Sequence, residues 1–212
     1  MYLVSDERLE KMKKILNTRQ NTLRVFMDNV FSTHNLSAIV RTCDAVNIGK
    51  LYYRHQKKVR LNNDITMGAH KWIFHEYVED IENFYQNIKS QNYQIVVTML
   101  DKQSVDFKEV DYTKPTLIVL GNEVEGISDV SIEYADKKVI IPMFGMSQSL
   151  NVSVANAVIL YEAQRQRAIK GMYETPSLSN ELIEKTLKKW AYDDIIEKEL
   201  KRVKYKNHNC IV

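Results

Sequence analysis

The chain has 212 residues, a length typical of one domain with extensions, and its 44% hydrophobic and 27% charged residues are ordinary for a globular protein with a proper core. Two cysteines, Cys43 and Cys210, are too few for a disulfide framework or a cysteine-rich zinc site, and no apolar run approaches the roughly 18 residues of a membrane helix. The first residues lack the basic and apolar regions of a signal peptide, so we expect a cytoplasmic protein without a membrane segment.

The formal net charge of +3 is unevenly distributed. Residues 1–19 hold five basic and three acidic residues, residues 165–212 hold eleven and seven, and residues 20–164 hold fourteen and seventeen. Both ends are therefore basic around an acidic middle, which allows a polyanion to bind at the ends. We divide the chain into an N-terminal basic helix, a central α/β domain and a C-terminal basic helical extension, with boundaries at 1–20, 21–170 and 171–212.

The first half of the chain alternates helices and strands. Apolar residues at helical spacing predict a helix that ends at about Arg19, and a short β-prone run follows at 23–27. A second helix is expected next, with Asn35 as its N-cap candidate and Gly49 at its C-terminal end. The elements expected after it are a strand at 51–53 and a helix near 80–90.

The second half contains three near-continuous apolar runs, at 94–100, 116–120 and 138–142. Such runs between helical segments are typical of a parallel sheet that helices cover on both faces. A helix is predicted over 151–168, and the apolar residues that share one face of it are Val154, Ala157, Val158 and Tyr161. Two basic amphipathic helices, at about 178–189 and 191–204, are expected to close the chain.

Common catalytic signatures are absent from the sequence. The five histidines include no pair at i, i+4, so we expect no metal site. No G-x-S-x-G, Walker A or G-x-G-x-x-G motif occurs, which argues against a serine hydrolase, a P-loop enzyme and a Rossmann cofactor site.

Composition leaves three segments unexplained: residues 35–45, 120–127 and 141–155. The first places Asn35 at a helix start and Arg41 about two turns later, inside an otherwise apolar stripe. The second is a glycine-bounded acidic loop after a buried strand, where open parallel sheets bind ligands. The third joins another strand end to a helix N-terminus, whose backbone amides can bind an anion.

Taken singly, each segment also has a purely structural explanation. Asn35 and Ser153 can be ordinary helix-start residues without a catalytic role, and Arg41 can be a surface ion-pair partner. Gly121 and Gly126 can be simple turn residues.

Together the segments read N-x-S-A-I-x-R-T-x-D-A, L-G-N-E-x-E-G-I and I-P-M-x-G-x-x-x-S-L-N-V-S-V-A. In this order and spacing they resemble motifs 1, 2 and 3 of the SpoU (TrmH-like) RNA 2′-O-methyltransferases of the SPOUT superfamily, and the resemblance extends over about residues 8–192. It implies a parallel α/β fold with a C-terminal trefoil knot. It also implies a homodimer that binds S-adenosylmethionine in the knot and shares its active site between subunits.

The resemblance assigns roles to individual residues. Arg41 matches the family's catalytic arginine, with Asn35, Glu123, Ser149 and Asn151 as its polar neighbours. The implied cofactor contacts are Thr98, Met99, Leu100, Gly121, Asn122, Glu123, Gly126, Ile140, Ile141, Ser149 and Leu150. The basic ends favour the tRNA-specific members, which methylate guanosine 18 in the D-loop, and the expected RNA contacts are Arg8, Lys11, Arg19, Lys201, Arg202 and Lys204.

Two questions stay open at this point. Arg41 either removes the ribose 2′-hydroxyl proton, as in the family mechanism, or stays protonated, aligns the substrate phosphate and stabilises the developing alkoxide. The alternatives to guanosine 18 are a 2′-O-methyltransferase for another tRNA or rRNA nucleotide, and a non-catalytic RNA-binding homologue.

Overall fold

The computed structural model describes residues 4–55, 61, 63–122 and 124–208. The chain forms two compact units. One is Gln20–Tyr173, and the other combines the two ends of the chain, up to Arg19 and from Glu174 onwards. The two ends predicted as separate extensions therefore belong to one unit.

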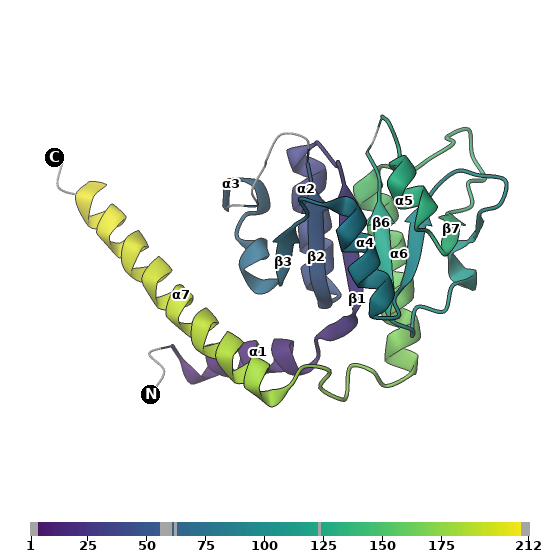
Figure 1. Cartoon of the computed structure of the whole chain (residues 1–212). Helices are drawn as coiled ribbons and strands as arrows, with labels where there is room; N and C mark the ends of the chain where they lie inside the picture. The colour runs from purple at the N-terminus through teal and green to yellow at the C-terminus, as the bar shows by residue number, and fades with distance from the viewer. Residues whose placement is uncertain (1–3, 56–60, 62, 123, 209–212) are drawn as a thin grey trace. The chain divides into compact units, whose positions relative to one another are not determined.

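The larger unit is built on one sheet of seven strands in the order β3-β2-β1-β6-β4-β7-β5 (Figure 1). Every pairing in it is parallel. The strands in chain order are β1 Gln20–Asp28, β2 Ile48–Arg54, β3 His75–Tyr77, β4 Gln94–Thr98, β5 Val105–Asp106, β6 Thr116–Leu120 and β7 Lys137–Ile140. The order places β6, β4 and β7 side by side, so the segments that follow these strands share one edge of the sheet.

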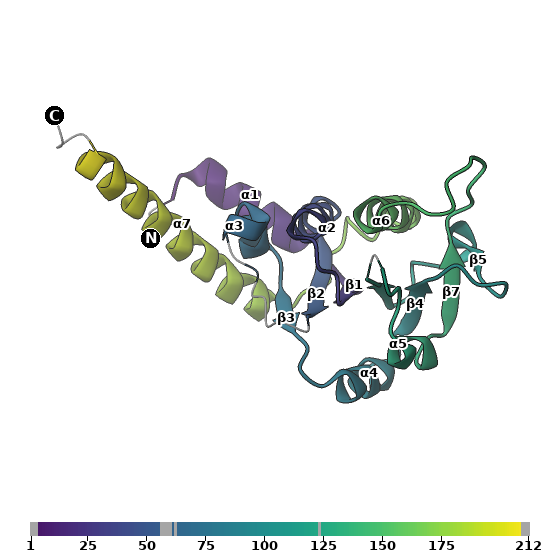
Figure 2. The ribbon, with the colours of Figure 1, turned by 90° about the horizontal axis from the view of Figure 1, so that it is seen from above.

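Helices cover both faces of this sheet (Figure 2). On one side lie α2 and α6, and on the other lie α4 and α5. Side chains of β1 alternate between the two layers, since Val25 and Met27 join one apolar cluster and Phe26 joins the other. The helices of this unit are α2 Thr33–Ala45, α3 Asn63–Thr66, α4 Ile81–Ser90, α5 Asp129–Glu133 and α6 Val152–Ile169, with short 3₁₀ turns at Ala69–Trp72 and Phe107–Glu109.

The smaller unit contains α1, Asp6–Asn17, and α7, Asn180–His208, which are in contact. The Ser5 hydroxyl caps α1 by accepting a hydrogen bond from the Arg8 amide. None of the helices in the part of the chain that the structure describes is long and apolar enough to cross a bilayer.

Most predicted elements of the central sheet are confirmed. The strands expected at 23–27, 51–53 and 116–120 lie within β1, β2 and β6, and the helices near 80–90 and 151–168 are α4 and α6. The other two strands end earlier than predicted, β4 at Thr98 and β7 at Ile140.

The predicted ends of α2 are wrong. The helix is capped by Ser32, whose hydroxyl accepts from the Asn35 amide at 3.5 Å, and Asn35 itself lies in the first turn. At the other end Asn47, with φ 58°, adopts the left-handed conformation predicted for Gly49. Gly49 lies in β2, where an added Cβ would come within 2.5 Å of the Asn21 carbonyl oxygen. This glycine therefore serves the close approach of β1 and β2.

Three further expectations are corrected. The two C-terminal helices form one helix, α7, because no residue between 189 and 191 breaks helical geometry. The predicted apolar face of α6 is divided: Val154 is 47% and Tyr161 54% exposed, whereas Val158 packs against the core beside the buried residues Ile159 and Leu160. Arg41 lies on the exposed side of α2, outside the buried stripe.

Candidate active site

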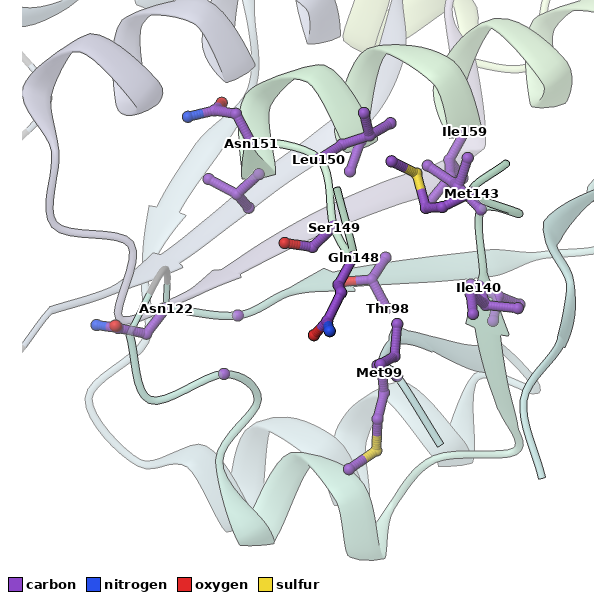
Figure 3. Close-up of a pocket in the computed structure, with 17 residues that line it drawn as sticks. Thr98, Met99, Asn122, Ile140, Met143, Gln148, Ser149, Leu150, Asn151 and Ile159 are labelled. Atoms are coloured by element: carbon purple, nitrogen blue, oxygen red, sulfur yellow. The ribbon is translucent and has the colours of Figure 1, made fainter. Parts of the chain in front are cut away.

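A pocket of about 380 Å³ lies at the carboxyl ends of β4, β6 and β7 (Figure 3). Three loops and the first turns of α6 form its walls. Because the three strands are neighbours and parallel, their following loops meet at one place, as expected for a ligand site in an open α/β sheet. Its lining residues are Thr98, Met99, Leu100, Gly121, Asn122, Gly126, Val139, Ile140, Ile141, Met143, Gln148, Ser149, Leu150, Asn151, Val152, Ala155 and Ile159.

The structure brings together ten of the eleven residues predicted as cofactor contacts: Thr98, Met99, Leu100, Gly121, Asn122, Gly126, Ile140, Ile141, Ser149 and Leu150. The eleventh, Glu123, lies outside the described residues. These positions come from three segments far apart in the sequence.

No titratable side chain is among the residues that the structure places along the pocket walls. The walls are mostly apolar, with a few amide and hydroxyl groups. Such a surface can bind and orient an uncharged or delocalised group, but the described walls provide no general acid or base.

The loop after β6 is closed on itself. The Asn122 amide donates to the Gly126 carbonyl at 2.8 Å, and the Gly126 amide donates back at 3.0 Å. The Asn122 side-chain oxygen accepts from the amides of Val124 and Glu125. A Cβ on Gly121 would lie 2.5 Å from the Gly126 backbone, so only glycine fits there.

The loop after β4 is held at its base by an ion pair. Lys138 Nζ lies 2.6 Å from a carboxylate oxygen of Asp101, directly after Leu100. The hydrogen bond from Lys138 lowers the pKa of Asp101, so this carboxylate is ionised at neutral pH. The Ser104 hydroxyl also donates to the Met99 carbonyl at 2.8 Å.

The third loop leads into the N-terminus of α6, which Asn151 caps. Its side-chain oxygen accepts from the Ser153 amide at 2.9 Å, and its amide nitrogen donates to the side-chain oxygen of Asn35 at 3.1 Å. This bond joins the first and third sequence segments. Three of the five predicted catalytic residues, Asn35, Ser149 and Asn151, therefore lie at or next to the pocket.

Arg41 is not brought to this pocket within one chain. It is exposed on α2 and is not among the lining residues. Its side chain makes no hydrogen bond or ion pair with any residue that the structure describes. The explanation of Arg41 as a surface ion-pair partner therefore finds no support among those residues.

The predicted RNA contacts fall into three groups. Lys11 is exposed and Arg8 half-buried on α1. Arg19 is only 1% exposed, with its guanidinium 5.6 Å from the centre of the Trp190 ring, so burial makes it unsuited to the RNA contact predicted for it. Lys201, Arg202 and Lys204 belong to α7, but their side chains lie outside the described part of the structure.

Sequence reasoning missed six lining residues: Val139, Met143, Gln148, Val152, Ala155 and Ile159. Val152, Ala155 and Ile159 follow one another at helical spacing, so the helix predicted over 151–168 contained the signal for them. Met143 and Gln148 lie on the irregular loop, where no periodicity indicates which side chains turn inward.

Among the described residues, no group of three or more His, Cys, Asp or Glu side chains could hold a metal ion.

Comparison with known proteins shows two matching family models. Residues 22–161 match the SpoU rRNA Methylase family, and residues 165–204 match the C-terminal model of SpoU rRNA methylases. The tRNA (guanosine(18)-2′-O)-methyltransferase of Aquifex aeolicus is 57% identical over 203 residues, which cover 95% of this chain and 96% of that protein.

Comparison with solved structures finds members of the same family. The crystal structure of the A. aeolicus TrmH/SpoU tRNA modifying enzyme matches with a TM-score of 0.84 at 56% identity, over 90% of this chain and 98% of that one. The SpoU methyltransferase AviRb from Streptomyces viridochromogenes, solved in complex with the cofactor AdoMet, matches with a TM-score of 0.65 at 28% identity. The match covers 71% of this chain and 62% of that one. On the sheet, the pocket and these matches, the chain belongs to the SpoU methylase family.

Proposed function

We propose that this protein transfers a methyl group from S-adenosylmethionine to the ribose 2′-hydroxyl of guanosine 18 in tRNA. The proposal rests on one observation: ten of the residues predicted to contact the cofactor line a single pocket at the carboxyl ends of β4, β6 and β7. The relative from A. aeolicus, matched over nearly its whole length, is named for this reaction.

The pocket suits the cofactor. Its volume lies within the usual range of about 300–1,000 Å³ for ligand pockets, and its apolar walls suit an adenine ring and a methionine chain. Glycine at position 121, where a Cβ would collide with the Gly126 backbone, keeps the two sides of the loop after β6 close together at the pocket wall. When bound, S-adenosylmethionine supplies a methyl group activated by the positive sulfonium.

The chain's own residues orient the reactants. With no titratable group on the described walls, the main contribution is in-line positioning of two bound molecules, which can lower a barrier by about 7–11 kcal/mol. In this proposal a protonated Arg41 aligns the substrate phosphate and stabilises the charge that develops on the 2′-oxygen. The hydrogen bond between Asn151 and Asn35 holds the start of α2 against the start of α6 at the pocket.

The position of Arg41 favours a site made by two chains. Because this side chain is exposed and does not line the pocket of its own chain, we infer that the partner subunit of a homodimer supplies it. Exposed apolar side chains on the loops and on α6 offer a surface for that partner: Leu100, Val124, Phe144, Met146, Val154 and Tyr161. The trefoil knot implied by the family resemblance stays a prediction.

The charge distribution favours an RNA surface on the smaller unit. That unit holds thirteen basic and ten acidic residues, whereas the larger unit holds seventeen of each. Arg165, Arg167 and Lys170, counted above with the basic C-terminal end, belong to the larger unit. We infer that tRNA phosphates contact α1 and α7, and that the protein acts in the cytoplasm, where tRNA is modified.

A transfer assay tests this function. The protein is incubated with radiolabelled S-adenosylmethionine and bulk tRNA, and labelled nucleosides are mapped. We expect 2′-O-methylguanosine at position 18. Label at another nucleotide would show a different target, and binding of tRNA without label would show a non-catalytic homologue.

A further inference from the structure

We propose that Asp28 is a positioning residue for the pocket: its buried carboxylate anchors the end of the loop between β6 and α5, and so sets the affinity for S-adenosylmethionine. The proposal deepens the proposed function and rests on it. Asp28 lies at the end of β1 and is not among the pocket-lining residues.

The carboxylate of Asp28 is held by α5. Asp28 is 1% exposed, and its Oδ2 accepts hydrogen bonds from the Ser128 hydroxyl at 2.5 Å, the Ser131 hydroxyl at 2.7 Å and the Ser128 amide at 3.3 Å. No lysine or arginine in the described part of the chain pairs with it. A buried carboxylate is costly without compensating bonds, so these donors determine where the carboxylate and α5 lie relative to each other.

Ser128 connects this anchor to the loop. It is the N-cap of α5 and directly follows Ile127, the last residue of the loop. The bonds to Asp28 therefore fix the point at which the loop ends and the helix begins.

The other side of the loop is tied to the next residue of the chain. The side-chain amide of Asn122 donates to the Asn29 carbonyl at 2.9 Å. Asn29 has φ 58°, a left-handed turn directly after β1. Residues 28 and 29 thus hold both ends of one loop, and Figure 3 shows the Asn122 side chain pointing away from Ser149 and Gln148.

The loop has little freedom to shift without changing the pocket. Gly121 and Gly126 line the pocket, and a Cβ on Gly121 would lie 2.5 Å from the Gly126 backbone. A displacement at Ser128 is therefore passed along the backbone to the pocket wall. Loss of the anchor should weaken cofactor binding more than it slows the transfer step, which depends on groups elsewhere.

The same network contains a matched control. The Tyr85 hydroxyl, buried on α4, donates to Ser131 at 2.7 Å. The Tyr85→Phe change removes a buried hydrogen bond from this cluster and leaves the Asp28 to Ser128 bonds in place. It separates a general loss of stability from a loss of loop position.

The experiment compares the full-length wild type with Asp28→Ala, Asp28→Asn, Ser128→Ala and Tyr85→Phe. S-adenosylmethionine binding is measured by calorimetry below the unfolding transition, with kcat and KM from tRNA methylation. We expect Asp28→Ala to raise the Kd and the KM for S-adenosylmethionine at least tenfold, with kcat within threefold of the wild type. Ser128→Ala should have the same effect. Asp28→Asn, which keeps one acceptor oxygen, should give an intermediate Kd and provides the test if Asp28→Ala does not fold. Tyr85→Phe should lower the melting temperature with Kd within twofold.

Three results would overturn the proposal. They are an unchanged Kd for S-adenosylmethionine in both Asp28 variants, a lower kcat in Asp28→Ala with an unchanged KM for S-adenosylmethionine, or a Kd for Tyr85→Phe as high as that for Asp28→Ala. Hydrogen exchange at the Asn122 and Gly126 amides of the cofactor-free protein gives an independent result, because each amide is bonded within the loop. Faster exchange is expected in the Asp28 variants and not in Tyr85→Phe. If the wild type bound no S-adenosylmethionine, the proposed function would fail, and this exchange would still decide the role of Asp28.

Discussion

Arg167, near the end of α6, offers a direct test of how a buried cation stabilises this fold. It is fully buried, and its guanidinium donates to five oxygens: the carbonyls of Thr22, Tyr112 and Lys114, the Thr22 hydroxyl and the Gln20 side chain. Burial lowers the pKa of Arg167 to about 10, which leaves the group protonated at neutral pH. The residue fastens α6 to the starts of β1 and β6, at the end of the helix away from the pocket.

The Arg167→Lys change keeps the charge but offers three donors from one atom, so at least two of the five acceptors lose the hydrogen bond that they receive from residue 167. A buried polar group without a partner costs about 1–3 kcal/mol, which gives a loss of about 2–6 kcal/mol in the free energy of unfolding. For a protein of this size, each kcal/mol shifts the melting temperature by about 2–4 °C. We therefore expect a decrease of about 4 °C or more.

Arg165 supplies the control, two residues earlier on the same helix. Its side chain is 59% exposed and pairs with Glu162 at 2.7 Å. Arg165→Lys should change the melting temperature little, because exposed ion pairs contribute little. Thermal unfolding of both variants at equal protein concentration is the assay. Equal melting temperatures for the two variants would refute the reasoning that the buried bonds stabilise the fold.

Three other outcomes are expected. Arg41→Lys should lose nearly all methyl transfer and keep S-adenosylmethionine binding, since lysine cannot form a planar bidentate contact with phosphate; near-normal turnover would remove Arg41 from catalysis. Light scattering at micromolar protein should give the mass of a homodimer, and a fully active monomer would contradict this. We expect the dimer interface to bury well over about 1,200 Å² in total. Neutralising the four basic residues of the C-terminal tail should weaken tRNA binding and leave cofactor affinity unchanged. The slope of log affinity against log salt concentration should fall by up to about 0.7–0.9 for each phosphate that the protein no longer neutralises. If the variant and the wild type gave the same affinity and the same slope, the RNA surface would lie elsewhere, for example on α1. These four residues are Lys201, Arg202, Lys204 and Lys206.

The central strands of the sheet were predictable because they are buried on both faces, whereas the short, partly exposed edge strands β3 and β5 were not predicted. Runs such as 116–120 contain no charged residue that could blur the pattern, and β6 has the predicted bounds. Helix ends were harder to predict, because several residues can cap. Ser32 and Asn35 are both good N-cap types, and Asn47 can take the left-handed turn as well as glycine.

The cofactor pocket was predictable for a different reason. Its residues follow strand ends, and the order of parallel strands brings those ends together whatever the side chains are. The anchor at Asp28 was not predictable, because its partners Ser128 and Ser131 lie about 100 residues away in the chain. Local sequence carries no sign of such a contact.

The distribution of charge favours cofactor binding by the larger unit and RNA binding by the smaller unit. Apolar side chains and a few amide and hydroxyl groups form the pocket walls, with no titratable group among the described residues there. The larger unit has balanced charge, and the excess positive charge belongs to the smaller unit formed by the two chain ends. A cofactor held mainly by shape and backbone contacts is insensitive to salt, whereas RNA held by lysine and arginine is not. On the proposed function we therefore expect the two ligands to bind independently, and in the proposed dimer to meet only where Arg41 of the partner subunit contacts the substrate phosphate.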